Sequence, residues 1–276
     1  MTTHVTDQMQ RDIVLPDSVE RIVSLVPSQT ELLFALGAGE RVVGVTKFCT
    51  EPKEQVAGVA KVGGTKKFDF QAIAALKPDL IIGNKEENYP EGIGQLAQDY
   101  PVWMSDIVTL DDALAMIRGI GTLAGKTETA NEIVATIADS FRQLALECVT
   151  GHTSELRGGT RSNRPVKVAY LIWQKPYMVA AGDTFITEML TLGGVENVFS
   201  GLDRYPQVDL QTLQASDAEA VLLSSEPFPF RQKHLTEFQA MLPDKKILLV
   251  DAMPFSWYGS QLLRTASYLR ELRTQL

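Results

Sequence analysis

The sequence predicts an α/β protein with two Rossmann-like lobes of mostly parallel sheets, joined by a single long helix. One observation behind this prediction is a repeated sequence motif. An aspartate followed by a predicted short helix and a predicted buried strand occurs at 69–82 and again at 209–223. Aspartate is a favoured helix N-cap, so Asp69 and Asp209 are each expected to start a helix. A second similarity precedes each copy, at 31–37 and 188–194. Two pairs of similar segments in the same order along the chain indicate two similarly built lobes. A cleft between such lobes is the usual place for a ligand.

The second observation is the alternation of strands with helices. After an N-terminal extension over 1–20, the first lobe is expected over 21–108, with strands at 21–25, 42–46, 80–83 and 102–104 and helices at 27–36 and 92–98. The second lobe is expected over 150–276, with strands at 166–172, near 198, 220–224 and 247–251 and helices at 184–192, 210–215 and 260–273. This alternation, without hairpin signals, favours parallel sheets.

The third observation is the segment over 109–149, which we expect to consist of connecting helices. One helix runs to about Ala124 and ends at Gly125, and a second runs from Thr127 to about Cys148. Apolar residues recur at helical spacing along the second helix: Ala130, Ile133, Ile137, Phe141 and Leu144. Its length of roughly 30 Å suits a strut between lobes, and an ordinary covering helix is the alternative.

Composition excludes several functions. The formal net charge of −8 argues against a nucleic-acid partner or an anionic membrane. The basic cluster at 157–164 falls in a polar segment over 150–164 that we expect to be a surface loop. No apolar run approaches the length of a membrane helix.

Localisation is predicted from the start of the given sequence. The segment Met1–Asp12 is polar and has no signal-peptide character, so the protein as written is expected in the cytoplasm. An export signal missing from the given sequence would place it in the periplasm. Cys49 and Cys148 match no paired motif and need not form a disulfide, as in a reduced compartment.

Catalytic signatures are missing from the sequence. It contains no GxSxG, HExxH, Walker loop or GxGxxG after a strand. The segment Gly63–Lys67 could bind an anion or form a plain turn, and we favour the plain turn. His4, His152 and His234 fall in a tail, in the polar loop and in a segment that we expect to be exposed. With so few imidazoles, neither a bare metal ion nor an integral cofactor is expected.

Aromatic and polar side chains cluster where the predicted strands end. In parallel sheets the loops beyond the carboxyl ends of strands form the binding crevice, and large planar side chains there suit a flat, bulky ligand. Core packing or loop anchoring is the alternative for each of them. The candidate ligand-binding residues are Ser28, Phe48, Asn84, Trp173, Tyr205, Trp257 and Tyr258.

From 21 to the C-terminus the sequence resembles the helical-backbone metal receptors, the periplasmic binding proteins for iron chelates and vitamin B12. The segments that carry the resemblance are Arg21–Glu31, Val42–Thr46, Ala75–Ile82, Gly193–Phe199 and Tyr205–Val208. It is closest to the cobalamin-binding members. The resemblance implies two α/β lobes joined by one long helix, and a whole chelate (corrinoid, haem or siderophore) in the inter-lobe cleft. It also implies that Phe48 and Tyr205 flank a corrin ring and that Trp257 stands where such binders carry a polar residue.

Two departures from the family pattern bear on function. The tryptophans that B12 binders carry near 64–68 and near Asn84 are missing here. Exported members also dock onto arginines of a permease through one glutamate in each lobe, and the matching positions here are Gln71 and Gln211. An amide loses the charge, which weakens electrostatic docking.

We therefore expect a monomeric, non-enzymatic binding protein for a metal chelate, with cobalamin among the candidate ligands, acting in the cytoplasm as carrier, scavenger or sensor. The alternative is a periplasmic component of an ABC importer, with a permease as partner. A lesser alternative is an enzyme in the same cleft, for which Asp183, Glu86, Glu87 and Asp251 offer carboxylates without diagnostic spacing.

Overall fold

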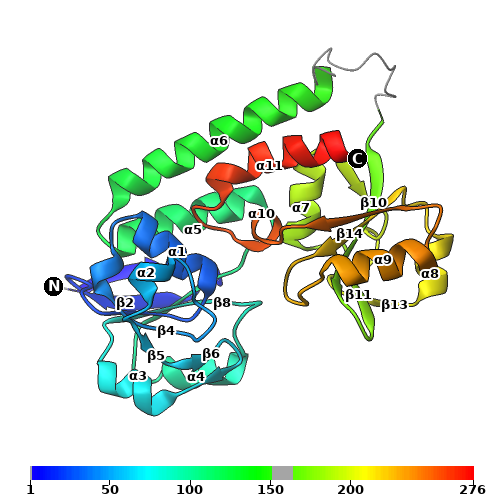
Figure 1. Cartoon of the computed structure of the whole chain (residues 1–276). Helices are drawn as coiled ribbons and strands as arrows, with labels where there is room; N and C mark the ends of the chain where they lie inside the picture. The colour runs from blue at the N-terminus through cyan, green and yellow to red at the C-terminus, as the bar shows by residue number, and fades with distance from the viewer. Residues whose placement is uncertain (1, 151–163) are drawn as a thin grey trace. The chain divides into compact units, whose positions relative to one another are not determined.

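The computed structural model describes residues 2–150 and 164–276, and these residues divide into two compact α/β units (Figure 1). One unit comprises Met1–Ile107, Asp111–Thr136 and Tyr258–Ser260, and the other comprises Val108–Leu110, Ile137–Trp257 and Gln261–Leu276. The boundary falls inside the single long helix α6 (Thr127–Thr150). This agrees with the predicted fold class of two α/β lobes and one long helix. The loop predicted over 150–164 lies outside the described residues except at its two ends, and so does His152.

The first unit is built on a five-stranded parallel sheet in the order β5-β4-β3-β8-β9. Its strands are β3 (Ile22–Ser24), β4 (Val42–Val45), β5 (Ala60–Lys61), β8 (Leu80–Asn84) and β9 (Val102–Ser105). Its helices are α1 (Pro27–Ala35), η1 (Gly39–Arg41), α2 (Lys53–Val56), α3 (Phe70–Leu76), α4 (Pro90–Leu96) and α5 (Leu110–Leu123), with the start of α6. Every residue of β8 is buried, as expected for a central strand covered on both faces.

The second unit is built on a mixed sheet in the order β13-β11-β10-β14-β15, with β12 also paired to β10. Its strands are β10 (Val166–Trp173), β11 (Tyr177–Ala180), β12 (Val195–Asn197), β13 (Gln207–Val208), β14 (Ala220–Ser224) and β15 (Lys246–Val250). Its helices are α7 (Phe185–Leu192), α8 (Leu210–Ala215), α9 (Gln232–Met241), α10 (Met253–Ser256) and α11 (Leu262–Gln275). The buried core includes Leu171, Val221 and Phe238, which come from two strands and a helix.

Both copies of the repeated motif form the predicted N-cap, short helix and buried strand. The carboxylate of Asp69 accepts a hydrogen bond from the Ala72 N–H at 3.0 Å, and Asp209 accepts one from the Thr212 N–H at 2.7 Å. The following strands β8 and β14 are fully buried. These hydrogen bonds confirm the two N-caps. Because a cap depends only on residues close in sequence, the sequence pattern was sufficient to predict it.

Four antiparallel pairings among the described residues were not expected. They join β1 (Thr2–Thr6) to β2 (Asp12–Pro16), β6 (Gly63–Gly64) to β7 (Lys67–Phe68), β10 to β11, and β11 to β13. The first hairpin turns without a glycine: Gln10 has φ 60°, and the Asp7 carboxylate accepts from the N–H groups of Met9 and Arg11. Tight hairpins are recognised in a sequence by dipeptides such as Asn-Gly. A turn held by an aspartate side chain has no such dipeptide, so the sequence pattern did not predict it.

The prediction of an exposed His234 is wrong. This side chain is only 6% exposed, and its Nδ1 accepts the Arg231 backbone N–H at 2.9 Å at the start of α9. Its ring also packs against Phe228 and Phe230. The polar residues around it in sequence suggested a surface segment, whereas the imidazole is a helix cap under an aromatic cluster.

Candidate functional site

A buried polar layer lies at the carboxyl ends of the strands in the first unit. Gln29 donates from Nε2 to Ser105 Oγ at 2.6 Å, and Asn84 donates from Nδ2 to the same oxygen at 2.9 Å. Thr30 donates to Ser24 Oγ at 2.8 Å. These side chains are buried, so the layer holds the strand ends and helix α1 together.

Two of the predicted ligand residues belong to this buried layer. Asn84 is 1% exposed, and its Oδ1 accepts the N–H groups of Glu86 at 2.8 Å and Glu87 at 3.1 Å. Its amide therefore shapes the loop after β8. Ser28 is 3% exposed at the start of α1. Asn84 therefore supports the edge of the sheet, and in this structure both Asn84 and Ser28 expose almost no surface to a ligand.

Phe48 is the exposed aromatic residue of this edge. It follows β4, and 52% of its surface is accessible. The ammonium nitrogen of Lys47 lies 5.0 Å from the centroid of the ring, a cation–π arrangement. Phe48 therefore presents an exposed ring, and its contact with a ligand stays a prediction.

The second unit carries an aromatic cluster at the end of β10. Trp173 is 38% exposed and packs edge-on against Phe228, with ring centroids 5.6 Å apart. The loop after β14 delivers Phe228, because the Phe228 N–H donates to the Ile172 carbonyl at 3.3 Å. Phe230 lies against Phe228 at 4.8 Å between centroids. Sequence reasoning missed Phe228 and Phe230, although they follow the buried strand β14 and so satisfy the same strand-end rule.

Tyr205, Trp257 and Tyr258 lie in other surroundings. Tyr205 is half-buried in the segment beside β11, where the Ala181 N–H donates to the Arg204 carbonyl at 2.8 Å. Trp257 is 7% exposed and donates from Nε1 to a Glu226 carboxylate oxygen at 3.4 Å. Tyr258 is 4% exposed. Of the candidates in the second unit, Trp173 therefore offers the most accessible ring.

The two glutamines singled out by the sequence occupy equivalent positions. Gln71 and Gln211 are each the second residue of a helix, α3 and α8, and both are exposed. Each follows an aspartate N-cap. Both copies of the repeated motif thus carry a neutral amide at the second position of the helix.

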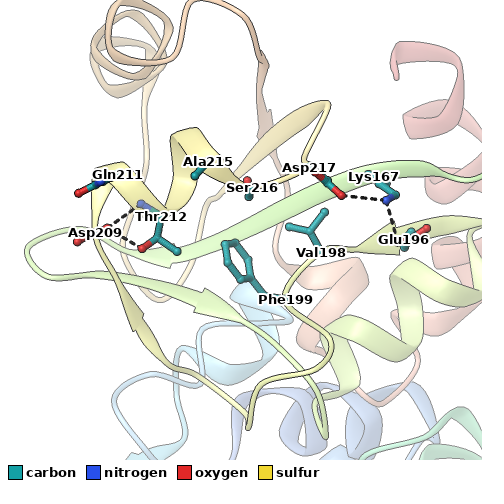
Figure 2. A pocket seen from close by; sticks show the side chains of 10 residues that line it. All are labelled: Lys167, Glu196, Val198, Phe199, Asp209, Gln211, Thr212, Ala215, Ser216 and Asp217. Carbon is teal, nitrogen blue, oxygen red and sulfur yellow. Dashed lines mark hydrogen bonds and ion pairs between the residues drawn. The ribbon is translucent and has the colours of Figure 1, made fainter.

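A surface pocket of ≈ 580 Å³ opens beside α8 in the second unit (Figure 2). Its lining residues are Lys167, Glu196, Val198, Phe199, Asp209, Gln211, Thr212, Ala215, Ser216 and Asp217. Lys167 lies between two carboxylates, with Nζ 3.8 Å from Glu196 and 3.4 Å from Asp217. Its charge is therefore already compensated. The lining is largely polar and includes none of the predicted ligand contacts, so this pocket is a poor match for a large apolar chelate.

The described residues contain no group of three or more His, Cys, Asp or Glu side chains arranged to hold a metal ion. Both cysteines are free thiols. Cys49 is buried among Thr30 and Thr46, and burial raises the pKa of its thiol. Within the described ranges, no helix has both the length and the apolar character needed to cross a membrane.

Comparison with known proteins places this geometry in a family. A family model described as "Periplasmic binding protein" matches residues 22–245. The vitamin B12-binding protein of Vibrio cholerae serotype O1 is 27% identical over 263 residues, covering 95% of this chain and 90% of that protein.

Two solved structures share the fold. The periplasmic vitamin B12-binding protein BtuF of Vibrio cholerae has a TM-score of 0.77 at 21% identity, covering 95% of this chain and all of that one. The periplasmic haem-binding protein RhuT from Roseiflexus sp. RS-1 has a TM-score of 0.76 at 22% identity, covering 93% of this chain and 97% of that one. These relatives are binding proteins, so the prediction of a non-enzymatic protein is confirmed. With its two α/β units, its long helix and a family model matched over most of its length, the chain belongs to the periplasmic binding protein family.

Proposed function

We propose that this protein binds a bulky metal chelate, a corrinoid, a haem or a ferric siderophore, without changing it chemically. The observation that carries the proposal is the exposed, ring-supported indole of Trp173 at the end of β10. An aromatic face held in place by neighbouring rings meets a planar ligand with little loss of side-chain entropy. Phe48 offers a second exposed ring at the corresponding edge of the other unit.

The donor groups support a ligand that arrives with its metal already coordinated. His234 is buried and uses Nδ1 to accept a backbone N–H, and the Cys49 thiol is buried. The relatives named above are described as binding vitamin B12 or haem, which are complete chelates. A whole corrinoid or haem therefore suits this chain better than a bare ion.

Ultrafiltration retention tests the proposal. The protein is incubated separately with cyanocobalamin, haem and a ferric siderophore at tens of micromolar, and retained ligand is measured by its absorbance. Retention of at least one chelate in equimolar amount, recovered unaltered, is the expected result. Retention of none of the three would contradict the proposed function.

The role downstream of binding has two candidates. Delivery to the permease of an ABC importer suits a periplasmic binding protein. Action without a permease, as carrier, scavenger or sensor, suits the neutral amides of Gln71 and Gln211, which offer hydrogen bonds but no charge to a basic docking surface. We favour the second role on this ground.

The double variant Q71E/Q211E separates the two roles. Wild type and variant are compared for binding to vesicles that contain the ABC permease encoded in the same genome, at low salt. We expect weak binding by the wild type and a gain in the variant. Tight, salt-sensitive binding by the wild type would favour the importer role instead.

A further inference from the structure

We propose that the Phe48 edge of the first unit selects chelates that carry an anionic group, a carboxylate or a phosphate, through Lys47 with support from Lys66. This inference rests on the proposed function and concerns the same ligand. It starts from the segment Gly63–Lys67, for which the sequence left open a plain turn or an anion site. In the structure this segment is the β6–β7 hairpin, and it packs directly against the loop that carries Phe48.

Three loops of the first unit are tied together around this hairpin. The Lys47 N–H donates to the Gly63 carbonyl at 2.8 Å, joining the loop after β4 to the hairpin. Asn88 donates from Nδ2 to the Thr65 carbonyl at 3.1 Å, joining the loop after β8 to the hairpin tip. The three loops therefore form one surface within this unit.

Close packing over a glycine fixes the ring and the lysine stem on this surface. A Cβ atom added at Gly64 would lie 3.2 Å from Cε2 of Phe48 and 3.5 Å from Cε of Lys47. Both side chains thus lie across the backbone of Gly64, with the Lys47 ammonium over the ring of Phe48. A ligand ring stacked on Phe48 would bring its periphery to that ammonium group.

Three lysines in and beside these loops have no carboxylate partner in the described part of the chain. Lys47 lies on the ring, Lys61 donates to the Cys49 carbonyl at 3.4 Å, and Lys66 donates to the Glu86 carbonyl at 2.5 Å. By contrast, Lys85 in the same region is paired with Asp106 at 2.5 Å. The half-buried acids Glu86 and Glu87 lie in the loop after β8 and limit the net positive charge on that side.

Ammonium groups without a carboxylate partner are important for binding an anionic ligand, because the chain as a whole carries a formal charge of −8. Such a chain repels anions in general, so an anionic ligand needs a local cationic contact. A charge-assisted hydrogen bond to a ligand carboxylate or phosphate, next to a stacking ring, supplies both orientation and specificity. Neutral chelates of the same shape would gain only the stacking.

The test uses two pairs of probes that share a macrocycle and differ in whether they carry an anionic group. Haem, with two propionates, is compared with haem dimethyl ester. Cyanocobalamin, with a phosphodiester, is compared with dicyanocobinamide, which lacks the phosphodiester and the nucleotide attached to it. Affinities of wild type, K47Q/K66Q and F48A are measured by absorbance titration at low and high salt. K77Q is the matched control, because Lys77 is exposed on the same unit at the opposite end of the sheet, after α3 and before β8.

We expect K47Q/K66Q to weaken binding of the member that carries the anionic group about tenfold at low salt and to leave the member without it within about twofold. K77Q should behave as wild type, F48A should weaken both members, and K47R/K66R should retain the preference. Equal effects of K47Q/K66Q on both members, or no effect on either, would overturn this inference while the proposed function stands. If wild type binds none of the four probes but retains a ferric siderophore, this inference is overturned and the proposed function stands. If wild type binds none of the four probes and no ferric siderophore, the proposed function itself fails and this inference fails with it.

Discussion

The indole ring of Trp173 packs edge-on against the ring of Phe228, with centroids 5.6 Å apart and ring planes at 69°. The contact joins the end of β10 to the loop after β14, two segments far apart in sequence. It supports the exposed indole from behind and leaves its other surface accessible. Phe228, Phe230 and His234 continue the cluster toward helix α9.

The variant W173A should weaken chelate binding by about 1–2 kcal/mol, because a stacked aromatic contact of this size is removed. W173F should recover part of the loss, since a smaller ring still packs on Phe228. Absorbance titration with the bound chelate measures both variants. An unchanged affinity in W173A would mean that the ligand lies elsewhere.

Asn84 is expected to act through the loop that it shapes. N84A removes the acceptor of the Glu86 and Glu87 N–H groups and one of the two hydrogen bonds that Ser105 Oγ accepts, and should lower the free energy of unfolding by about 1–3 kcal/mol. The neighbouring change K85A removes an exposed ion pair and should cost less than about 1 kcal/mol. Urea denaturation compares the two, and equal stability losses would argue against a buried structural role for Asn84.

The N-terminal hairpin should depend on one buried carboxylate. Asp7 is 3% exposed and accepts from the Arg11 side chain at 2.8 and 2.6 Å and from the Met104 N–H at 3.1 Å. D7N should lower the free energy of unfolding by about 1–3 kcal/mol, because an amide cannot accept all of these hydrogen bonds. D12N, on the exposed face of the same hairpin, is the matched control and should change stability by less than about 0.5 kcal/mol.

His234 should make stability depend on pH. Burial lowers the pKa of its imidazole below the usual 6.5, so the unfolded chain binds the proton first as pH falls. Its contribution is complete above about pH 6.5 and is lost as pH drops through 6.5 toward the lower folded pKa. Unfolding free energies at neutral and mildly acidic pH should therefore differ more in wild type than in H234Q.

The glutamine variant is informative because it keeps an acceptor for the Arg231 N–H while removing the titration. H234A removes both and should be less stable than H234Q at every pH. If H234Q retains the full wild-type pH dependence between those two conditions, another group is responsible.

Local features of this chain were predictable and long-range ones were not. The N-caps at Asp69 and Asp209 depend on residues three positions away, so the sequence pattern was sufficient. The role of Asp7 depends on Met104, which only the folded sheet brings near. Similarly, strand ends could be located from apolar runs, but whether Asn84 or Phe48 is exposed depends on packing from other loops.

The aromatic cluster illustrates the same limit at the site. Trp173 was found because it directly follows an obvious buried strand. Phe228 and Phe230 lie in a proline-containing loop after β14, and the contact of Phe228 with Trp173 arises from the pairing of β14 with β10. His234 was assigned to the surface because its sequence neighbours are polar, although its own ring is buried.

Tryptophan fluorescence can report directly whether a chelate meets the exposed indole of Trp173. The chain has three tryptophans, of which Trp103 and Trp257 are 3% and 7% exposed and Trp173 is 38% exposed. Wild type, W173F and W257F are titrated with cyanocobalamin, haem and a ferric siderophore. We expect saturable quenching with at least one chelate, most of it lost in W173F and kept in W257F. No saturable quenching of wild type with any of the three, or quenching that survives unchanged in W173F, would contradict this expectation.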